Sequence, residues 1–91
     1  MRAAVAAGIP SALADLGQLV RIPSIAWPSF DQTQVQRSAA AVAALAEGTG
    51  LFDSVRVTDA PIGDTGERGR PAVLATRAAA EGRPTILLYA H

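Results

Sequence analysis

The feature that most constrains this chain is an unbroken apolar run, "TILLYA", at residues 85–90. A strand that alternates apolar and polar residues can leave one face in water, whereas a run without alternation is typical of a strand covered on both faces. We therefore predict a strand inside a sheet, and a fold in which helices pack on that sheet. The run leads directly to His91, the only histidine of the sequence.

Two helices are predicted before any strand. The first begins at Pro10 and Ser11, because the Ser11 hydroxyl can accept a hydrogen bond from a free backbone N–H. Leu13, Leu16 and Val20 then recur at helical spacing. The pattern stops at the segment "RIPS", where a proline disfavours helical geometry in the residue before it. We predict that residues 1–10 are disordered.

The second predicted helix opens at Asp31, and Gln34 three residues later completes the Asp form of a capping box. Glycines at 48 and 50 end it. One apolar stripe is expected to face a sheet and a polar set to face water. The stripe is Val35, Ala39, Val42 and Ala46, flanked by Leu45, and the polar set is Gln32, Gln36, Arg37 and Glu47.

Three strands follow the helices. The first lies in "LFDSVRVTD" at 51–59, where Val55 and Val57 alternate with Ser54, Arg56 and Thr58 and predict one wet face. The second is "AVLATR" at 72–77. The third is the apolar run that ends at His91. Residues 60–71, with three glycines and two prolines, are predicted to form a mobile loop. Two helices and then three strands predict an α/β fold with helices packed on a mixed sheet.

Composition excludes several classes of function. The chain has no cysteine, which rules out disulfide scaffolds, thiolate metal sites and cysteine nucleophiles. The net charge is zero, so nothing favours nucleic acid or an anionic membrane as a partner. The first apolar stretch is interrupted by Gly8 and Pro10, so we expect neither a signal peptide nor a membrane span. We therefore expect a cytoplasmic protein. Basic residues that are all arginine, together with many alanines, resemble the codon bias of a GC-rich bacterial genome.

The candidate residue for chemistry is His91. A histidine at the C-terminal end of a buried strand lies at the edge where open α/β sheets build ligand sites, and neutral imidazole is a common zinc ligand. One ligand cannot make a site, however. The acidic residues occupy strand ends and turns, where solvated charge is the ordinary interpretation; they are Asp53, Asp59, Asp64, Glu67 and Glu81.

Four stretches in order resemble a known family. They are "DLGQLVRIPSIA" at 15–26, "FDSVRV" at 52–57, "GRPAVLA" at 69–75 and "RPTILLYAH" at 83–91. Together they are similar to the dinuclear zinc peptidases and deacylases, which include acetylornithine deacetylase, succinyl-diaminopimelate desuccinylase, aminoacylase, carnosinase-like dipeptidases and carboxypeptidase G. The ending Tyr-Ala-His at 89–91 is closest to the dipeptidase branch.

The resemblance implies a role for His91 as a ligand to one of two zinc ions, with cobalt or manganese as possible replacements. In the family a bridging Asp follows two residues later, and the Glu general base and the remaining ligands lie further downstream. The complete enzymes are expected to be homodimers that hydrolyse peptides or N-acyl amino acids with a metal-activated water. This chain has no base, so no catalytic residue is assigned, tight zinc binding is not expected and its own enzymatic activity stays undecided.

By the resemblance, residues 1–91 form a partial N-terminal segment of a mixed-sheet zinc-peptidase catalytic domain. A later strand of the family fold would lie between the second and third strands predicted here, which leaves "TILLYA" without a partner and prone to aggregate. The alternative is a small non-catalytic α/β module that binds another protein through an exposed strand edge.

Overall fold

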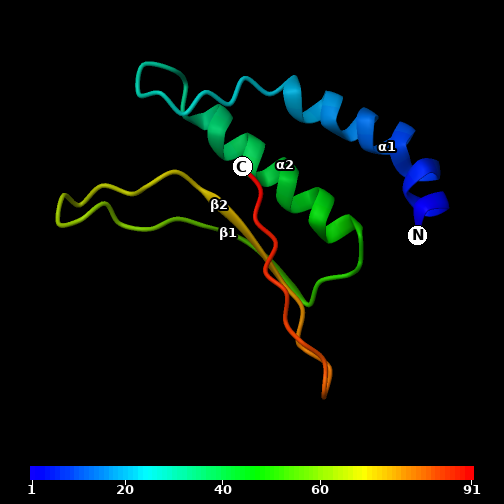
Figure 1. Ribbon diagram of the computed structural model, residues 1–91. Helices are drawn as coiled ribbons and strands as arrows, with labels where there is room; N and C mark the ends of the chain where they lie inside the picture. Colours follow the sequence, from blue (N-terminus) through cyan, green and yellow to red (C-terminus); the bar gives the residue numbers. More distant parts are fainter.

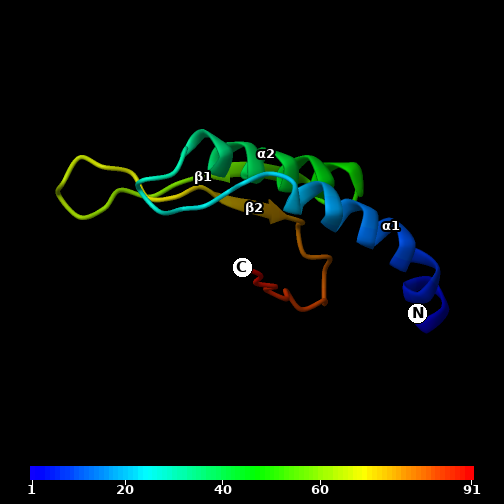
Figure 2. The same ribbon diagram turned by 90° about the horizontal axis from the view of Figure 1, so that it is seen from above.

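The computed structural model describes residues 1–91. In chain order it contains α1 (Arg2–Val20), α2 (Thr33–Gly48), β1 (Ser54–Thr58) and β2 (Ala72–Thr76). The two strands pair antiparallel, α2 packs on them, and α1 contacts α2 but neither strand. Figures 1 and 2 show the resulting layers, with α2 over the sheet and α1 beside α2. The predicted α/β fold of helices followed by strands is confirmed.

The helix α1 is longer than the sequence predicted. It begins at Arg2, so residues 2–10, which we predicted to be disordered, form its first half, and none of them is buried. Alanine has the highest helix propensity, and five of residues 2–10 are alanine or arginine. Pro10 lies inside the helix at the cost of one backbone hydrogen bond, because its nitrogen has no hydrogen to donate.

Because α1 continues through Gly8 and Pro10, it is 19 residues long and apolar enough to cross a membrane. The expectation that no segment meets these two criteria was therefore wrong for α1. Signal sequences near an N-terminus and core helices of soluble proteins meet the same criteria, and none of α1 is buried. Length and composition alone thus leave the location of the protein open.

The start of α2 agrees with the prediction. The Asp31 carboxylate accepts hydrogen bonds from the Thr33 backbone N–H at 3.0 Å and from the Thr33 hydroxyl at 2.6 Å. These are the hydrogen bonds of an N-terminal cap, and Asp31 makes them one residue before Gln32, which precedes the first helical residue Thr33. A difference of one residue is usual at helix ends. The Gln34 side chain accepts from Arg37 instead of completing the capping box.

The sequence had suggested that Gln32 faces water, but in the structure it does not. Its side-chain nitrogen donates to the carbonyls of Ile25 at 3.1 Å, Trp27 at 2.7 Å and Phe30 at 3.0 Å. The side-chain oxygen is buried without a hydrogen-bond partner. One amide therefore holds the connector between the helices against the start of α2.

The core is the contact between α2 and the sheet. Ala39 and Ala43 are the only buried residues, at 8% and 9% exposure. The sequence pattern identified Ala39 but not Ala43, which lies one turn further along the helix. In the sheet Val55 pairs with Ala75 and both are half-buried, whereas Arg56 on the opposite face is exposed. The prediction of one wet face for residues 54–58 is confirmed.

The segment between the strands continues the hairpin. A bridge joins Pro61 to Arg68, and Arg68 forms an ion pair with Asp59. The guanidinium of Arg70 donates twice to the Ala26 carbonyl, at 3.1 and 3.0 Å. These contacts tie the base of the segment to β1 and to the interhelical connector, while the mobility of residues 60–71 stays a prediction.

The third strand is absent. Residues 84–91 have no strand structure, and Figure 2 shows them running below the sheet without joining it. The prediction of a third strand was wrong because an apolar run forms a strand only when another strand supplies its hydrogen bonds. The observed sheet has two strands, so it is antiparallel and not mixed.

Candidate functional site

The segment that carries His91 leaves the sheet through a tight turn. The backbone N–H of Arg83 donates to the Ala80 carbonyl at 3.0 Å, and Gly82 within this turn has φ 71°. That positive φ suits glycine, because a Cβ atom would be strained there. The turn reverses the chain, so that the segment runs back in the direction opposite to β2, on the side of the sheet away from α2 (Figures 1 and 2).

The apolar side chains of this segment are not covered. Ile86, Leu87, Leu88 and Tyr89 are 77–88% exposed. Leucine and isoleucine at such exposure gain none of the free energy that burial of a large apolar side chain supplies. The segment therefore has the composition of a core strand and the surroundings of a surface loop.

His91 itself is exposed, and no metal-binding cluster surrounds it. No group of three or more histidine, cysteine, aspartate and glutamate side chains that could hold a metal ion occurs in the chain. Zinc sites in proteins use three or four protein ligands. The donor set of this chain therefore does not fit a zinc ion, and no catalytic step can be assigned to a metal here.

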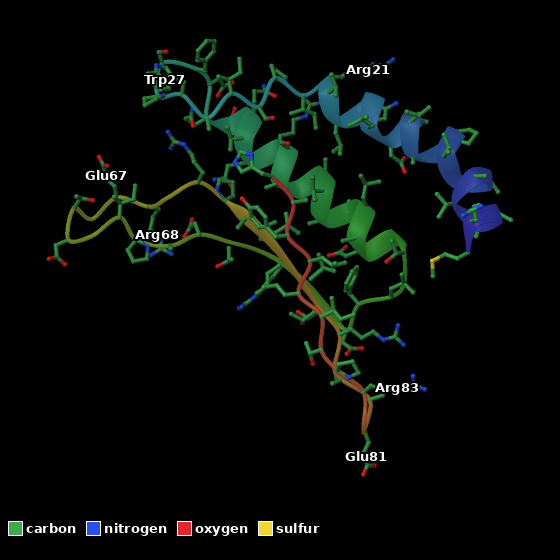
Figure 3. The ribbon with its side chains drawn as sticks, in the orientation of Figure 1. Arg21, Trp27, Glu67, Arg68, Glu81 and Arg83 are labelled. Atoms are coloured by element: carbon green, nitrogen blue, oxygen red, sulfur yellow. The ribbon has the colours of Figure 1, made fainter.

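The acidic residues do not gather with His91 into a group of three or more that could hold a metal ion. Asp53 accepts a hydrogen bond from the Ala78 backbone N–H at 2.6 Å, and Asp59 pairs with Arg68, so both stabilise the ends of the strands. Figure 3 shows Glu67 at the far end of the hairpin and Glu81 at the opposite tip of the molecule. The predicted role as solvated charges therefore omitted the partners of Asp53 and Asp59.

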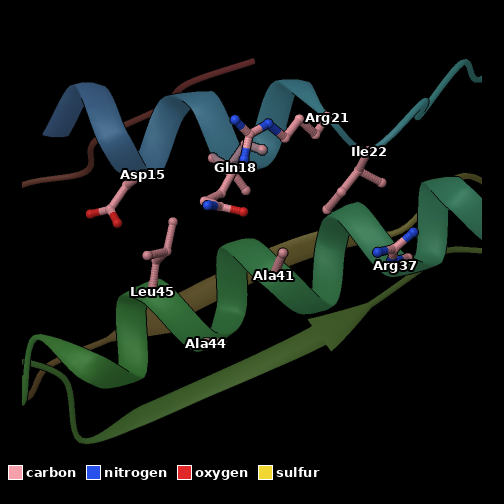
Figure 4. Close-up of a pocket in the computed structure, with 9 residues that line it drawn as sticks. Asp15, Gln18, Arg21, Ile22, Arg37, Ala41, Ala44 and Leu45 are labelled. Carbon is pink, nitrogen blue, oxygen red and sulfur yellow. The ribbon is translucent and has the colours of Figure 1, made fainter. Parts of the chain in front are cut away.

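A groove between α1 and α2 was not anticipated. Its volume is about 560 Å³, and Figure 4 shows Asp15 near one end and Arg21 with Arg37 toward the other. Leu19, Ile22 and Leu45 contribute apolar surface between these charges. The signal in the sequence is that Asp15 and Gln18 share a helical face with Leu19, which gives α1 a partly polar face toward α2.

That polar face explains why the helices pack loosely. Of the residues of α1 only Leu19 is half-buried. Charged side chains keep their water when they can, because burying an unpaired charge is costly. The groove is therefore a solvated gap between two helices, with charge of opposite sign at its ends.

The sequence predicted His91 as an isolated ligand position, and the structure gathers no group of three or more metal ligands around it. No protein-family model, curated protein or solved structure matches the chain in comparison. The family resemblance therefore depends on the quoted motifs alone.

Proposed function

We propose that this chain is the N-terminal segment of the catalytic domain of a zinc-dependent dipeptidase or amidohydrolase. In this proposal His91 is a ligand to one of the two metal ions, which are zinc and replaceable by cobalt or manganese. The substrate is a peptide or an N-acyl amino acid, and the chain does not hydrolyse it unaided. The complete enzyme is a cytoplasmic homodimer without nucleic-acid or membrane partners.

The observation that carries the proposal is the open core. Two alanines are the only buried residues, while the apolar segment that leads to His91 is almost fully exposed. An apolar strand in this state needs a neighbouring strand and a covering layer, which a larger domain supplies. The order of α1, α2, β1 and β2 supports the same conclusion, since the resembling stretches occur in that order.

The test extends the chain. The coding sequence that follows His91 is expressed in frame with it, and the product is assayed for zinc-dependent hydrolysis of dipeptides and N-acyl amino acids. We expect an Asp two residues after His91, activity that chelation removes, and loss of most activity in His91→Ala. A continuation without that Asp, or an active His91→Ala variant, contradicts the proposal.

A zinc titration of the 91-residue chain examines the donor set. We expect no one-to-one binding of submicromolar affinity, because one imidazole lacks the companions that zinc requires. Isothermal titration calorimetry with His91→Ala as the matched control measures this. Tight stoichiometric binding that disappears in His91→Ala would show that the chain builds a site of its own.

The second candidate function is a binding module, and the open edges of the sheet favour it. With two strands, β1 and β2 each have one edge that no strand pairs with, and such edges accept an added strand from another protein. This alternative requires the isolated chain to be folded and soluble. Far-UV circular dichroism and size-exclusion chromatography measure both properties, and an unfolded or aggregated chain excludes the module.

A further inference from the structure

The helix α1 carries five of its six large apolar residues on one side, away from α2, and only Leu19 lies toward α2. Val5, Ile9, Leu13, Leu16 and Val20 fall within an arc of about 80° at 100° per residue, and we call this set the α1 stripe. All five are 49–73% exposed. None of them lines the groove against α2, which is lined from α1 by Asp15, Gln18, Leu19 and two following residues.

The stripe is nearly the same when read in either direction. When the helix is reversed about the point between Ala12 and Leu13, Val5 takes the place of Val20 and Ile9 takes the place of Leu16, while Leu13 at the centre takes the place of Ala12. An interface between two identical chains related by a two-fold axis requires this kind of self-complementarity. A partner of unrelated sequence would not impose it.

Charge favours the same arrangement. Arg2 is the only charged residue on the arc of the stripe, because Asp15 and Arg21 line the groove on the other side of the helix. Two antiparallel helices place Arg2 of each beside the C-terminal end of the other, where free carbonyl groups give a partial negative charge. Parallel helices would instead place the two Arg2 side chains together.

The shape of the surface offers a seat for the partner. Val5, Ala6 and Ile9, with Met1 and Arg2, line a shallow hollow at the start of α1. In the antiparallel arrangement Leu16 and Val20 of the second chain lie over this hollow. Ala6 and Ala12 beside the stripe are small enough to let the two backbones approach.

From these observations we infer that the α1 stripe is a self-association surface, on which two copies of this chain pair through antiparallel α1 helices. The proposed function includes a homodimer but names no surface for it, and the inference supplies one without using His91 or the segment that carries it. Zinc titration and hydrolysis by the extended chain can therefore fail without affecting it, and the reverse also holds.

Cysteine cross-linking tests the direction of pairing, and the chain has no cysteine of its own. Val5→Cys and Val20→Cys chains are oxidised separately and as a mixture. We expect a disulfide-linked dimer from the mixture, containing one chain of each kind, in at least about tenfold higher yield than from either chain alone. Equal yields in the three reactions, as random aggregation gives, or dimers from Val5→Cys alone, overturn the inference.

Sedimentation velocity tests the stripe as the cause of pairing. Leu13→Glu places a charge near the two-fold axis and is expected to raise the dimer dissociation constant at least about tenfold, whereas Ala14→Glu, on another side of the helix, leaves it unchanged. Both residues are exposed, so circular dichroism should be the same for the two variants. A monomeric parent chain overturns the inference. A second result would also overturn it: the parent chain is monomeric and floats with phosphatidylcholine vesicles, and the Leu13→Glu variant does not float. That result would assign the stripe to lipid binding.

Discussion

Two regions of this molecule are rich in apolar residues, and they behave in opposite ways. Where α2 packs on β1 and β2, small alanines are buried. At the end of this sheet the Asp53 carboxylate accepts a hydrogen bond from the Ala78 backbone N–H. In α1 and in residues 84–91, larger apolar side chains remain in water. The comparison shows that apolar side chains are buried only where a surface of the right shape faces them, since apolar character alone did not bury the side chains of the second region.

The alanines succeed because they are small. A helix can approach a sheet closely when its facing residues are Ala39 and Ala43, and close approach excludes water from both surfaces. By contrast, α1 presents Asp15 and Gln18 toward α2 and points its large apolar residues elsewhere. Its neighbour therefore cannot cover them.

Breaking the buried region should have the largest effect. Ala39→Asp places a charge without a partner between α2 and the sheet, and we expect it to lower the free energy of unfolding by more than about 2 kcal/mol. Urea unfolding followed by circular dichroism measures the change. Ala40→Asp, exposed on the same helix, is the matched control and should cost less than about 1 kcal/mol. Equal losses would mean that the α2–sheet contact is not the core.

The next effect concerns the connector that joins the two regions. Gln32→Glu keeps the shape of the side chain but removes the donor that three carbonyls share, and places a carboxylate beside them. We expect a loss of about 1–3 kcal/mol in the free energy of unfolding. Gln36→Glu, exposed on the same helix, serves as the control. A Gln32→Glu variant as stable as the parent would show that the amide does not hold the connector.

A smaller effect is expected from the cap of α2. Hydrogen bonds from the Thr33 hydroxyl and backbone N–H lower the pKa of Asp31 below its ordinary value of 3.8. A lowered pKa in the folded state means that the unfolded chain binds the proton more readily. The stabilisation is therefore complete above the unfolded value and is lost as the pH falls through the folded one.

Thermal unfolding between pH 2 and 7 measures this contribution. The parent should lose stability below about pH 4, the ordinary range of an aspartate, more steeply than Asp31→Asn, which keeps a capping oxygen but does not titrate there. Asp31→Ala should be less stable than the parent at pH 7. Identical pH profiles for the parent and Asp31→Asn would remove Asp31 from the account of this helix.

The smallest effect is expected in the exposed region. Leu87→Asp should change the free energy of unfolding by no more than about 0.5 kcal/mol, because the leucine is 88% exposed and its removal leaves no cavity. Urea unfolding of the 91-residue chain measures it. In the extended chain of the proposed function the same substitution should be severe, since the segment would then be covered. A large effect in the short chain would mean that the segment is packed in solution.

Prediction from sequence succeeded where the signal is local. The Asp31 cap, the strand that contains Val55 and Val57, and the glycine stop after α2 depend on neighbouring residues. All three occur in the structure, although Val57 is 42% exposed. The start of α1 was predicted too late because Gly8 and Pro10 were weighed as helix breakers, whereas the surrounding alanines outweigh them. Ala43 was missed because the predicted stripe was centred toward Val42, which is 38% exposed, whereas the face of α2 that meets the sheet is turned toward Ala43.

Prediction of the candidate site from the sequence was limited in the same way. His91 could be chosen from the sequence, because a lone histidine after an apolar run is a local pattern. Its surroundings could not, because metal ligands come together only through the tertiary fold, and here no group of three or more of them forms.

The sequence by itself determined the class of α2, β1, β2 and the second half of α1, the Asp31 cap and the glycine stop of α2, and the helical spacing of Leu13, Leu16 and Val20. These depend on backbone preferences and on periodicity, which act within a few residues. Only the tertiary structure decided that alanines form the core, that "TILLYA" is not a strand, and that the α1 stripe faces water. Each of these depends on whether a second surface lies within contact distance, and no short stretch of sequence contains that surface.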